Sequence, residues 1–311
     1  MEISVVVPVY GCRECLSELC IRLNKHLTPL VKTFEIILVN DESDDESWNM
    51  IRRLANTYTQ VKGIRLSKNF GQHYAITAGI QAACGNWIVV MDCDLQDPPE
   101  EISKLYKTVK NGYDIVFTKR IIRHDSFIKR FSSSCFSFIF QKLTNMKSDP
   151  LMGNFSICSR QVAESFRTLK EQNRSYLQAL KWMGFNHMTI PITHARRFKG
   201  ETSYTLVKSF AYALDSITAY TNKPLILSVQ FGFIISFISF CAGIYLILRY
   251  YYMKIPIIGW TSMVVSIFFS TGLIIADLGI IGIYIGKIFI ETKKRPLYII
   301  KETVGFSHKI S

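Results

Sequence analysis

The sequence lacks two patterns that are typical of secreted or disulfide-stabilised proteins. Its first residues, Met1–Ser4, carry no basic segment and continue directly into a β-branched run, so we expect no signal peptide. The eight cysteines show no disulfide-like spacing. Cys12 and Cys15 form a CxxC pair, but neither a second pair nor a nearby histidine completes a zinc site. We therefore expect reduced thiols with a structural role in a cytosolic domain.

Acidic residues are scarce relative to basic ones. The 311 residues include 37 lysines and arginines against 24 acidic residues, which gives a formal net charge of +13. This excess fits nucleic acid, an anionic membrane or phosphate-bearing substrates, and composition alone does not choose between them. The mean hydropathy of +0.17 is high for a soluble enzyme and indicates membrane segments. The length suits one substantial domain with an appendage, or two small domains.

Short apolar runs alternate with amphipathic segments over the first 120 residues. Short, β-rich runs bounded by polar turns predict buried strands, and the segments between them have helical periodicity. This alternation predicts an α/β domain with a parallel sheet covered on both faces, and ligands bound beyond the C-terminal strand ends. The predicted strands are Ser4–Val7, Glu35–Val39, Gly63–Leu66, Trp87–Met91 and Asp114–Phe117, and the predicted helices are Cys15–His26, Ser47–Thr57, Tyr74–Ala83 and Pro99–Asn111.

The last third of the chain changes character. Leu225–Leu248 contains no charged residue and is long enough to span a bilayer, and Ile255–Gly286 is interrupted only by Asp277. The short linker between them predicts a helical hairpin. Basic residues flank its two outer ends, so we expect both termini to be cytosolic. A helix that starts near Tyr204 carries apolar residues on one face, and we expect it to lie at the membrane interface.

Acidic residues follow two of the predicted strands. Asp92 and Asp94 come directly after the fourth strand, where hard oxygen donors suit Mg²⁺ or Mn²⁺ bridging a diphosphate. Such a cation stabilises charge on a leaving nucleotide diphosphate. Asp41 follows the second strand and is placed to meet a nucleotide base or ribose, while Asp44 or Asp45 serves as the acidic cap of the next helix. Pro8–Tyr10 at the end of the first strand could form a wall of the same pocket.

Several ordered motifs resemble the family-2 glycosyltransferases with a GT-A fold. The resemblance runs through VVVPVY, LVNDES, SKNFGQHYAITAGI and MDCDLQDPPE. It continues through LMGNFSICSR, RRFKGETSY and GIYIGKIFIETKKRPLYII, and it is strongest to the polyprenyl-phosphate branch. That branch includes dolichol-phosphate mannosyltransferases and bactoprenol glucosyltransferases. The resemblance implies a nucleotide-sugar donor, a divalent metal, inversion at the anomeric carbon, a polyprenyl phosphate acceptor, and a homo-oligomer such as a tetramer.

The resemblance also implies roles for individual residues. The metal ligands would be Asp92, Asp94 and Gln96. The nucleotide sugar would be bound by Pro8, Tyr10, Asp41, Lys68, Asn69, Gly71 and Asp92. Arg197 and Lys199 would grip the acceptor phosphate, a task that suits a bidentate guanidinium, although they could equally form a basic collar at anionic headgroups. The residues expected to carry catalysis are Asp92, Asp94, Asn154 and Arg197.

The sequence departs from the family pattern at four places. Gly11 replaces a usual asparagine, and Ile283 replaces a glutamate in the second span, which gains Asp277. Glu42 replaces the glycine of DDGS, which could shift the loop near the base. Asn154 stands where relatives place the aspartate proposed as catalytic base.

The change at Asn154 matters most, because a sugar hydroxyl acceptor benefits from a general base. A phosphate monoester, with a second pKa of about 6, is already largely ionised at neutral pH. It needs placement more than deprotonation. We therefore expect Asn154 to act as a positioning residue in an active enzyme.

These observations predict four regions. Residues 1–203 form the GT-A catalytic domain, 204–223 an amphipathic interfacial helix, 224–290 two transmembrane helices, and 291–311 a cytosolic tail. The predicted reaction moves a hexose from a nucleotide-diphosphate sugar to undecaprenyl phosphate at the cytosolic face of the cell membrane. UDP-glucose is the first candidate for the donor. The alternatives are transfer to another lipid acceptor, or a non-catalytic membrane scaffold or flippase component. Nucleic-acid binding would explain neither the apolar spans nor the acid cluster, so we expect no nucleic-acid partner.

Overall fold

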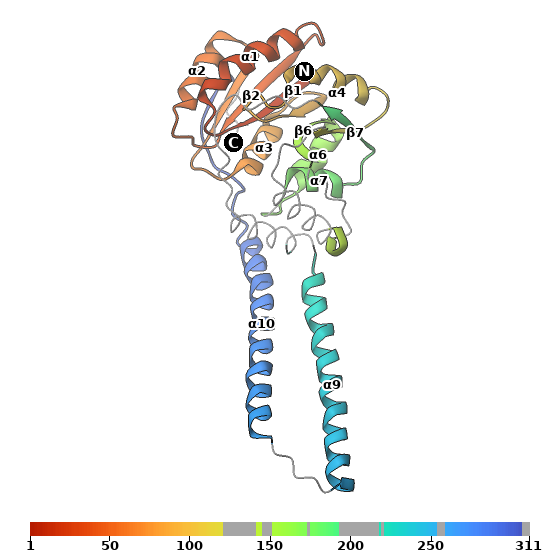
Figure 1. Ribbon diagram of the computed structural model, residues 1–311. Coiled ribbons are helices and arrows are strands. Elements are labelled where there is room, and N and C mark those ends of the chain that lie inside the picture. Colours follow the sequence, from red (N-terminus) through yellow and green to blue (C-terminus); the bar gives the residue numbers. More distant parts are fainter. Residues whose placement is uncertain are drawn as a thin grey trace. The chain divides into compact units, whose positions relative to one another are not determined.

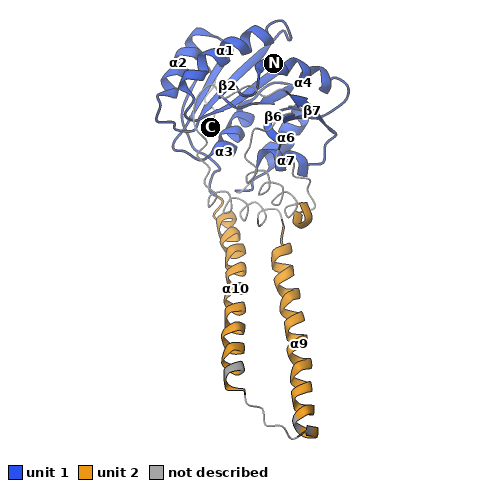
Figure 2. Cartoon of the chain, viewed as in Figure 1, with its two compact units in different colours: residues 1–137, 146–203, 295–311 blue, residues 138–145, 204–294 orange. Residues whose placement is uncertain are grey.

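A computed structural model of the chain describes residues 1–120, 141–144, 151–172, 175–192, 218, 221–253 and 259–306. The chain divides into two compact units, coloured separately in Figure 2. Unit 1 comprises residues 1–137, 146–203 and 295–311, and unit 2 comprises residues 138–145 and 204–294. The segment that follows the last long helix therefore returns to the unit that contains the first strand.

Unit 1 is built on an eight-stranded mixed sheet with the order β7-β5-β6-β4-β1-β2-β3-β8. The strands β4, β1, β2 and β3 pair in parallel, and so do β5 and β7. The strand β6 is antiparallel to both β4 and β5, and β8 is antiparallel to β3 at the edge. The bounds are β1 Ile3–Val9, β2 Phe34–Asn40, β3 Val61–Leu66, β4 Trp87–Val90, β5 Ile115–Arg120, β6 Met152–Ser159, β7 His187–Ile192 and β8 Ile300–Val304.

All five predicted strands are present, with ends shifted by up to three residues. The predicted helices are present as well, although the fourth begins as a 3-10 turn, Pro99–Glu101, before it becomes α-helical. The strands β6, β7 and β8 had not been predicted. The helices of unit 1 are α1 Arg13–Leu27, α2 Ser47–Thr57, α3 Gln72–Ala82, α4 Ile102–Val109, α6 Arg160–Thr168 and α7 Tyr176–Trp182.

Helices cover both faces of the sheet (Figure 1). Along β1, alternate residues such as Val5 and Val7 face one core, which contains the buried sides of α1, α2 and α4. Val6 faces the second core together with residues of α3, α6 and α7. Burial on both faces explains why β1 is apolar at nearly every position rather than at every second one.

The helix α3 packs very closely on the sheet. A Cβ added at Gly79 would lie 2.2 Å from Cγ1 of Val6 on β1. Only glycine fits at this point, and the close approach places the start of α3 beside the ends of β1 and β2.

Unit 2 contains two long apolar helices, α9 Lys223–Met253 and α10 Trp260–Thr292. The segments Lys223–Arg249 and Met263–Thr292 have mean hydropathies of 2.3 and 2.2, and they are long and apolar enough to cross a membrane. They contain most of the two predicted spans. Nearly all of the predicted interfacial helix lies outside the described residues.

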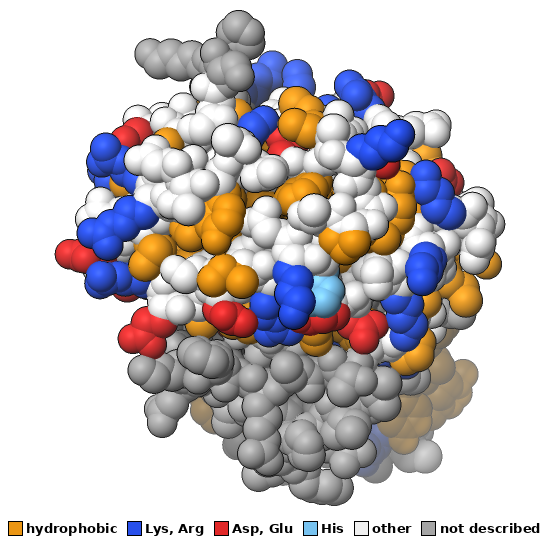
Figure 3. All heavy atoms as spheres, turned by 90° about the horizontal axis from the view of Figure 1, so that it is seen from above, with side chains coloured by type: hydrophobic (Ala, Val, Ile, Leu, Met, Phe, Trp, Pro, Cys, Tyr) orange, Lys and Arg blue, Asp and Glu red, His pale blue; other side chains and the backbone are white. Residues whose placement is uncertain are grey.

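The face of unit 1 seen in Figure 3 carries charges of both signs. Among the described residues drawn there, lysine and arginine side chains alternate with acidic ones, and hydrophobic side chains lie between them. The excess of basic residues is therefore not gathered into one stripe on this face, whereas a clustered stripe is the usual footprint of a nucleic-acid groove.

Candidate active site

The C-terminal ends of β1 to β5 and the N-terminal end of β6 lie along one edge of the sheet. This follows from the pairing, because β5 and β4 are each antiparallel to β6 and therefore run in the same direction. The residues that follow the parallel strands, such as Asp41 after β2 and Asp92 after β4, are thereby brought to one edge. In open α/β sheets this edge is where ligands bind.

Asp92 is at the centre of this edge and is half-buried. Its Oδ1 accepts a hydrogen bond of 2.7 Å from the side-chain amide of Gln72, and its carboxylate also accepts one from Asn154. Burial, followed by repulsion from Asp97 and Asp94, raises the pKa of Asp92 to about 7. The pKa is raised although the guanidinium of Arg120 and the bond from Asn154 favour the charged form.

The turn after Asp92 is strained. Oδ1 of Asp94 accepts a hydrogen bond of 3.1 Å from the backbone N–H of Gln96. Between them, Leu95 has a positive φ of 61°, which is unfavourable for a side chain with a Cβ, and only 4% of this residue is exposed. Burial of the leucine side chain holds the turn in this conformation. Backbone strain of this kind is concentrated at functional sites.

Asp41 organises the segment that follows β3. Its two carboxylate oxygens accept hydrogen bonds from the backbone N–H groups of Phe70, at 2.7 Å, and Gly71, at 2.8 Å. Gly71 has a φ of 105°, which only glycine adopts without strain. Asp41 is 3% exposed, and burial raises the pKa of its carboxyl although these two bonds lower it. The predicted donor-binding residues Lys68 and Asn69 are exposed in the segment that Asp41 holds.

The end of β1 presents one large exposed side chain. Pro8 is buried, whereas Tyr10 is 56% exposed and its ring is accessible to a planar ligand. At the start of α2, Asp45 rather than Asp41 accepts the N–H of Ser47. The N-cap position itself is occupied by Glu46, whose side chain makes no capping hydrogen bond, so the expectation that Asp44 or Asp45 is the N-cap is wrong. Asp45 contributes from the position before it.

The expectation of reduced thiols throughout is wrong in the structure, because Cys12 and Cys93 form a disulfide. Their Cα atoms are 6.2 Å apart although they are separated by 81 residues in sequence. Cys15 is buried and free, so the CxxC pair itself is not bridged. The disulfide joins the β1–α1 loop to the turn between Asp92 and Asp94, which places the exposed Tyr10 near the acid cluster.

Two predicted residues, Arg197 and Lys199, lie outside the described residues. The structure adds two that sequence reasoning missed, Gln72 at the start of α3 and Arg120 at the end of β5. Among the described residues, Nε of Arg120 is buried without a hydrogen-bond partner. The signal for Arg120 was its position at a strand end, the same signal that identified Asp92.

The side chains at this edge fit a divalent cation. Among the described residues no group of three or more His, Cys, Asp or Glu is arranged as a metal site. The expected ligands Asp92, Asp94 and Gln96 would instead supply two carboxylates and one amide oxygen. Oxygen donors of this kind suit Mg²⁺ or Mn²⁺ and leave positions open for phosphate oxygens. The repulsion that raises the pKa of Asp92 would be relieved by a bound cation.

Comparison with known proteins identifies the class. The family model described as glycosyl transferase family 2 matches residues 4–167, which include β1 to β6 and the acid cluster. A glycosyltransferase of Synechocystis is 34% identical over 99% of this chain and 97% of its own length. The chain therefore belongs to glycosyl transferase family 2, and it is a glycosyltransferase with a GT-A-like fold.

Relatives with more specific names match over the same length. A prophage bactoprenol glucosyl transferase homolog of Escherichia coli is 33% identical over 97% of this chain and 99% of its own length. The bactoprenol glucosyl transferase of Shigella phage SfX has the same identity and coverage. Among solved structures, glucosyl-3-phosphoglycerate synthase from Mycobacterium tuberculosis, in complex with Mn²⁺ and uridine diphosphate, matches with a TM-score of 0.50. It is 15% identical and covers 70% of this chain and 78% of its own, so it supports the fold alone.

Proposed function

We propose that this glycosyltransferase moves a hexose from a nucleotide-diphosphate sugar to a polyprenyl phosphate, such as undecaprenyl phosphate, at the cytosolic face of the membrane. One observation carries the proposal: relatives named bactoprenol glucosyl transferase match 97% of this chain and 98% to 99% of their own length. That length includes both the acid cluster and the two apolar helices. The helices would hold the enzyme where a lipid-linked phosphate lies. The same names favour glucose as the sugar, and we propose UDP-glucose as the first donor to test.

The reaction that fits these residues is a single inverting displacement. A phosphate oxygen of the acceptor forms a bond to the anomeric carbon, and the bond from that carbon to the diphosphate breaks. The leaving nucleoside diphosphate keeps the electron pair. With a second pKa of about 6, the acceptor phosphate is mostly ionised at neutral pH and needs no general base. This is compatible with asparagine rather than aspartate at position 154.

The chain's own residues have separate tasks in this proposal. Asp92 and Asp94 would hold the divalent cation, which when bound would neutralise charge on the leaving diphosphate. Asn154 and Gln72 fix the orientation of the Asp92 carboxylate through the hydrogen bonds described above. Tyr10 and the segment held by Asp41 receive the nucleoside. Arg197 and Lys199 are proposed to bind the acceptor phosphate.

The test uses membranes that contain the full-length protein, added undecaprenyl phosphate and a panel of radiolabelled nucleotide sugars. We expect one sugar to enter a lipid that mild acid cleaves, with Mn²⁺ or Mg²⁺ present and not with EDTA. Membranes with Asp94→Asn serve as the matched control. Transfer to diacylglycerol instead would identify another acceptor. No transfer from any donor by folded protein would refute the proposal and favour a non-catalytic role.

A further inference from the structure

The loop between β2 and α2, residues 41–46, holds two neighbouring segments of the proposed donor pocket. Asp41 binds the backbone after β3 through Phe70 and Gly71. On the other side, Oγ of Ser43 accepts a hydrogen bond of 2.8 Å from the backbone N–H of Gly11, directly after Tyr10. The position of this loop therefore sets the positions of both segments proposed to meet the nucleoside.

Glu42 occupies an unusual backbone conformation in this loop. Its φ is 51°, in the left-handed region where glycine is unstrained and a glutamate is not. The glutamate thus stands in a conformation that suits the glycine of the family pattern. The replacement has not forced this residue into an extended conformation. Interactions of the Glu42 side chain must therefore compensate for the backbone conformation, which favours glycine.

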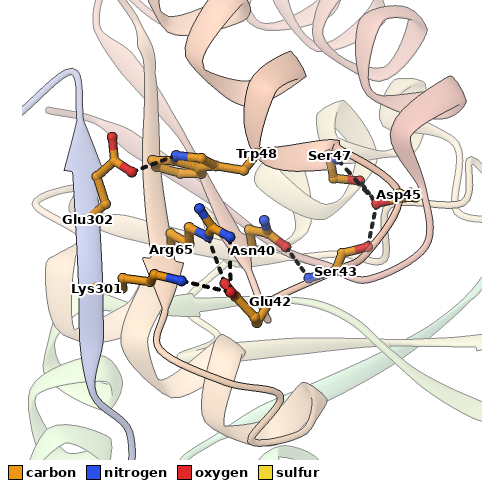
Figure 4. Close-up of polar contacts among 9 residues, drawn as sticks. All are labelled: Asn40, Glu42, Ser43, Asp45, Ser47, Trp48, Arg65, Lys301 and Glu302. Atoms are coloured by element: carbon orange, nitrogen blue, oxygen red, sulfur yellow. Dashed lines mark hydrogen bonds and ion pairs between the residues drawn. The ribbon is translucent and has the colours of Figure 1, made fainter.

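The carboxylate of Glu42 is clamped by two basic residues from different strands (Figure 4). Arg65 of β3 donates two hydrogen bonds to it, of 2.6 Å from Nε and 2.9 Å from Nη2. Lys301 of β8 donates a third, of 2.9 Å, from Nζ. These bonds lower the pKa of Glu42, with the bond from Arg65 contributing most, so the carboxylate is ionised at neutral pH.

The strand β8 holds the other end of the loop as well. Oε2 of Glu302 accepts a hydrogen bond of 2.9 Å from Nε1 of Trp48, a buried residue in the first turn of α2 (Figure 4). The backbone N–H of Ser67, after β3, donates to the carbonyl oxygen of Ile299 at 2.9 Å. A segment that follows α10 in sequence therefore contacts both the helix after the β2–α2 loop and the segment after β3.

We propose that Glu42, Arg65 and Lys301 are positioning residues that fix the β2–α2 loop, so that the C-terminal strand β8 sets the affinity for the nucleotide part of the donor. The inference rests on the proposed function, because it assumes that this loop borders the nucleoside. Ion pairs that are partly exposed contribute little to global stability. Their effect should therefore appear mainly in binding, where a small displacement of Asp41 and Ser43 moves both donor-binding segments.

The experiment measures KM and kcat for the donor with the full-length protein in membranes or detergent. The variants are Glu42→Gly, Lys301→Ala, their combination, and the conservative Lys301→Arg. We expect Glu42→Gly and Lys301→Ala to raise KM roughly three- to tenfold, with kcat within about twofold of wild type. Lys301→Arg should restore most of the affinity. The matched control is Glu164→Gln, which breaks the exposed ion pair of 2.9 Å with Arg160 on α6 and should change nothing.

Two readouts separate positioning from general damage. Because Lys301 acts through Glu42, adding Lys301→Ala to Glu42→Gly should raise KM no further. Glu42→Gly should keep its melting temperature, since glycine relieves the left-handed strain while the ion pairs are lost. An unchanged KM in both single variants, additive effects, or a parallel fall of kcat and melting temperature would each overturn the inference.

Calorimetric binding of UDP and GDP keeps this test independent of sugar transfer. We expect the same three- to tenfold loss in nucleotide affinity for Glu42→Gly and Lys301→Ala. If the wild type binds a nucleotide but transfers no sugar, the proposed function fails, and the proposed role of Glu42, Arg65 and Lys301 in nucleotide affinity is still tested. If the wild type transfers sugar and the variants bind nucleotide as tightly as wild type, the positioning role of Glu42, Arg65 and Lys301 is refuted and the proposed function stands.

Discussion

Replacing Asn154 with alanine removes one polar group from the part of the site where carboxylates are most crowded. The Asn154 amide donates a hydrogen bond to the Asp92 carboxylate, whose pKa is raised to about 7 by burial and by Asp97 and Asp94. Without this donor, the charged form of Asp92 is less favourable, and among the side chains described above the hydrogen bond from Gln72 is left to orient the carboxylate. Both effects weaken the proposed metal site.

The expected magnitude follows from the type of bond. A hydrogen bond to a charged group contributes about 1.5–3 kcal/mol. If the whole of it is lost in the transition state, the rate falls roughly 10- to 150-fold. Gln72→Ala removes the other amide from Asp92, but Gln72 is exposed and water can replace it, so a smaller loss is expected. Asn154→Asp adds another carboxylate beside three existing ones and should also lower the rate.

The assay is the initial rate of radiolabelled sugar transfer into lipid, measured over a range of Mn²⁺ concentrations. Asn154→Ala should need more Mn²⁺ for half-maximal rate, and excess Mn²⁺ should recover part of the loss. The reasoning would be refuted if Asn154→Ala turned over as fast as wild type. It would also be refuted if Asn154→Asp raised turnover by orders of magnitude, because aspartate would then be acting as the missing base.

Three further predictions concern stability and topology. Because Cys12 and Cys93 are 81 residues apart, chain entropy predicts that reducing their disulfide costs about 4.5 kcal/mol. The loss should appear as a lower melting temperature with dithiothreitol, and Cys12→Ser should have the same effect. Lys62→Met should destabilise unit 1 by about 3 kcal/mol in denaturant unfolding, because it leaves the carboxylate of Glu35, which is 0% exposed and 2.7 Å from Lys62 Nζ, buried without its cation. Cys84 is free and exposed, so a membrane-impermeant maleimide should label it in inside-out vesicles and not in intact cells, with Cys84→Ser as the control.

The strands that the sequence pattern predicted are those buried on both faces. A run such as Ile3–Val9 is apolar because helices cover both of its sides, and this is visible without any knowledge of its partners. The strand β8 has the sequence IKETV and is partly exposed, so its apolar pattern is too weak to be distinguished from a polar loop. It is a strand because it pairs with β3, and pairing across that distance in sequence is not readable from one chain.

The same limit applies to the site. Asp92 was identified because it follows a clearly apolar strand. Arg120 is the last residue of β5, but the predicted strand ended at Phe117, so Arg120 was not placed at a strand end. The disulfide between Cys12 and Cys93 and the bond from Gln72 to Asp92 connect segments whose proximity is set by the sheet order. Residue types and strand ends indicated the chemistry, while the partners of each side chain required the fold.

The pairing of β3 with β8 also bears on membrane topology, independently of the distribution of charge. The long apolar helices α9 and α10 lie between residues of unit 1 in sequence, since residues 295–311 belong to the same unit as residues 1–137. A sheet cannot be completed by strands on opposite sides of a bilayer, because the unpaired backbone groups cannot remain within the hydrocarbon layer. If the two helices cross a membrane, they must therefore begin and end on the same side of it. An even number of crossings then follows from β8 alone, and the flanking basic residues are needed only to predict which side of the membrane this is.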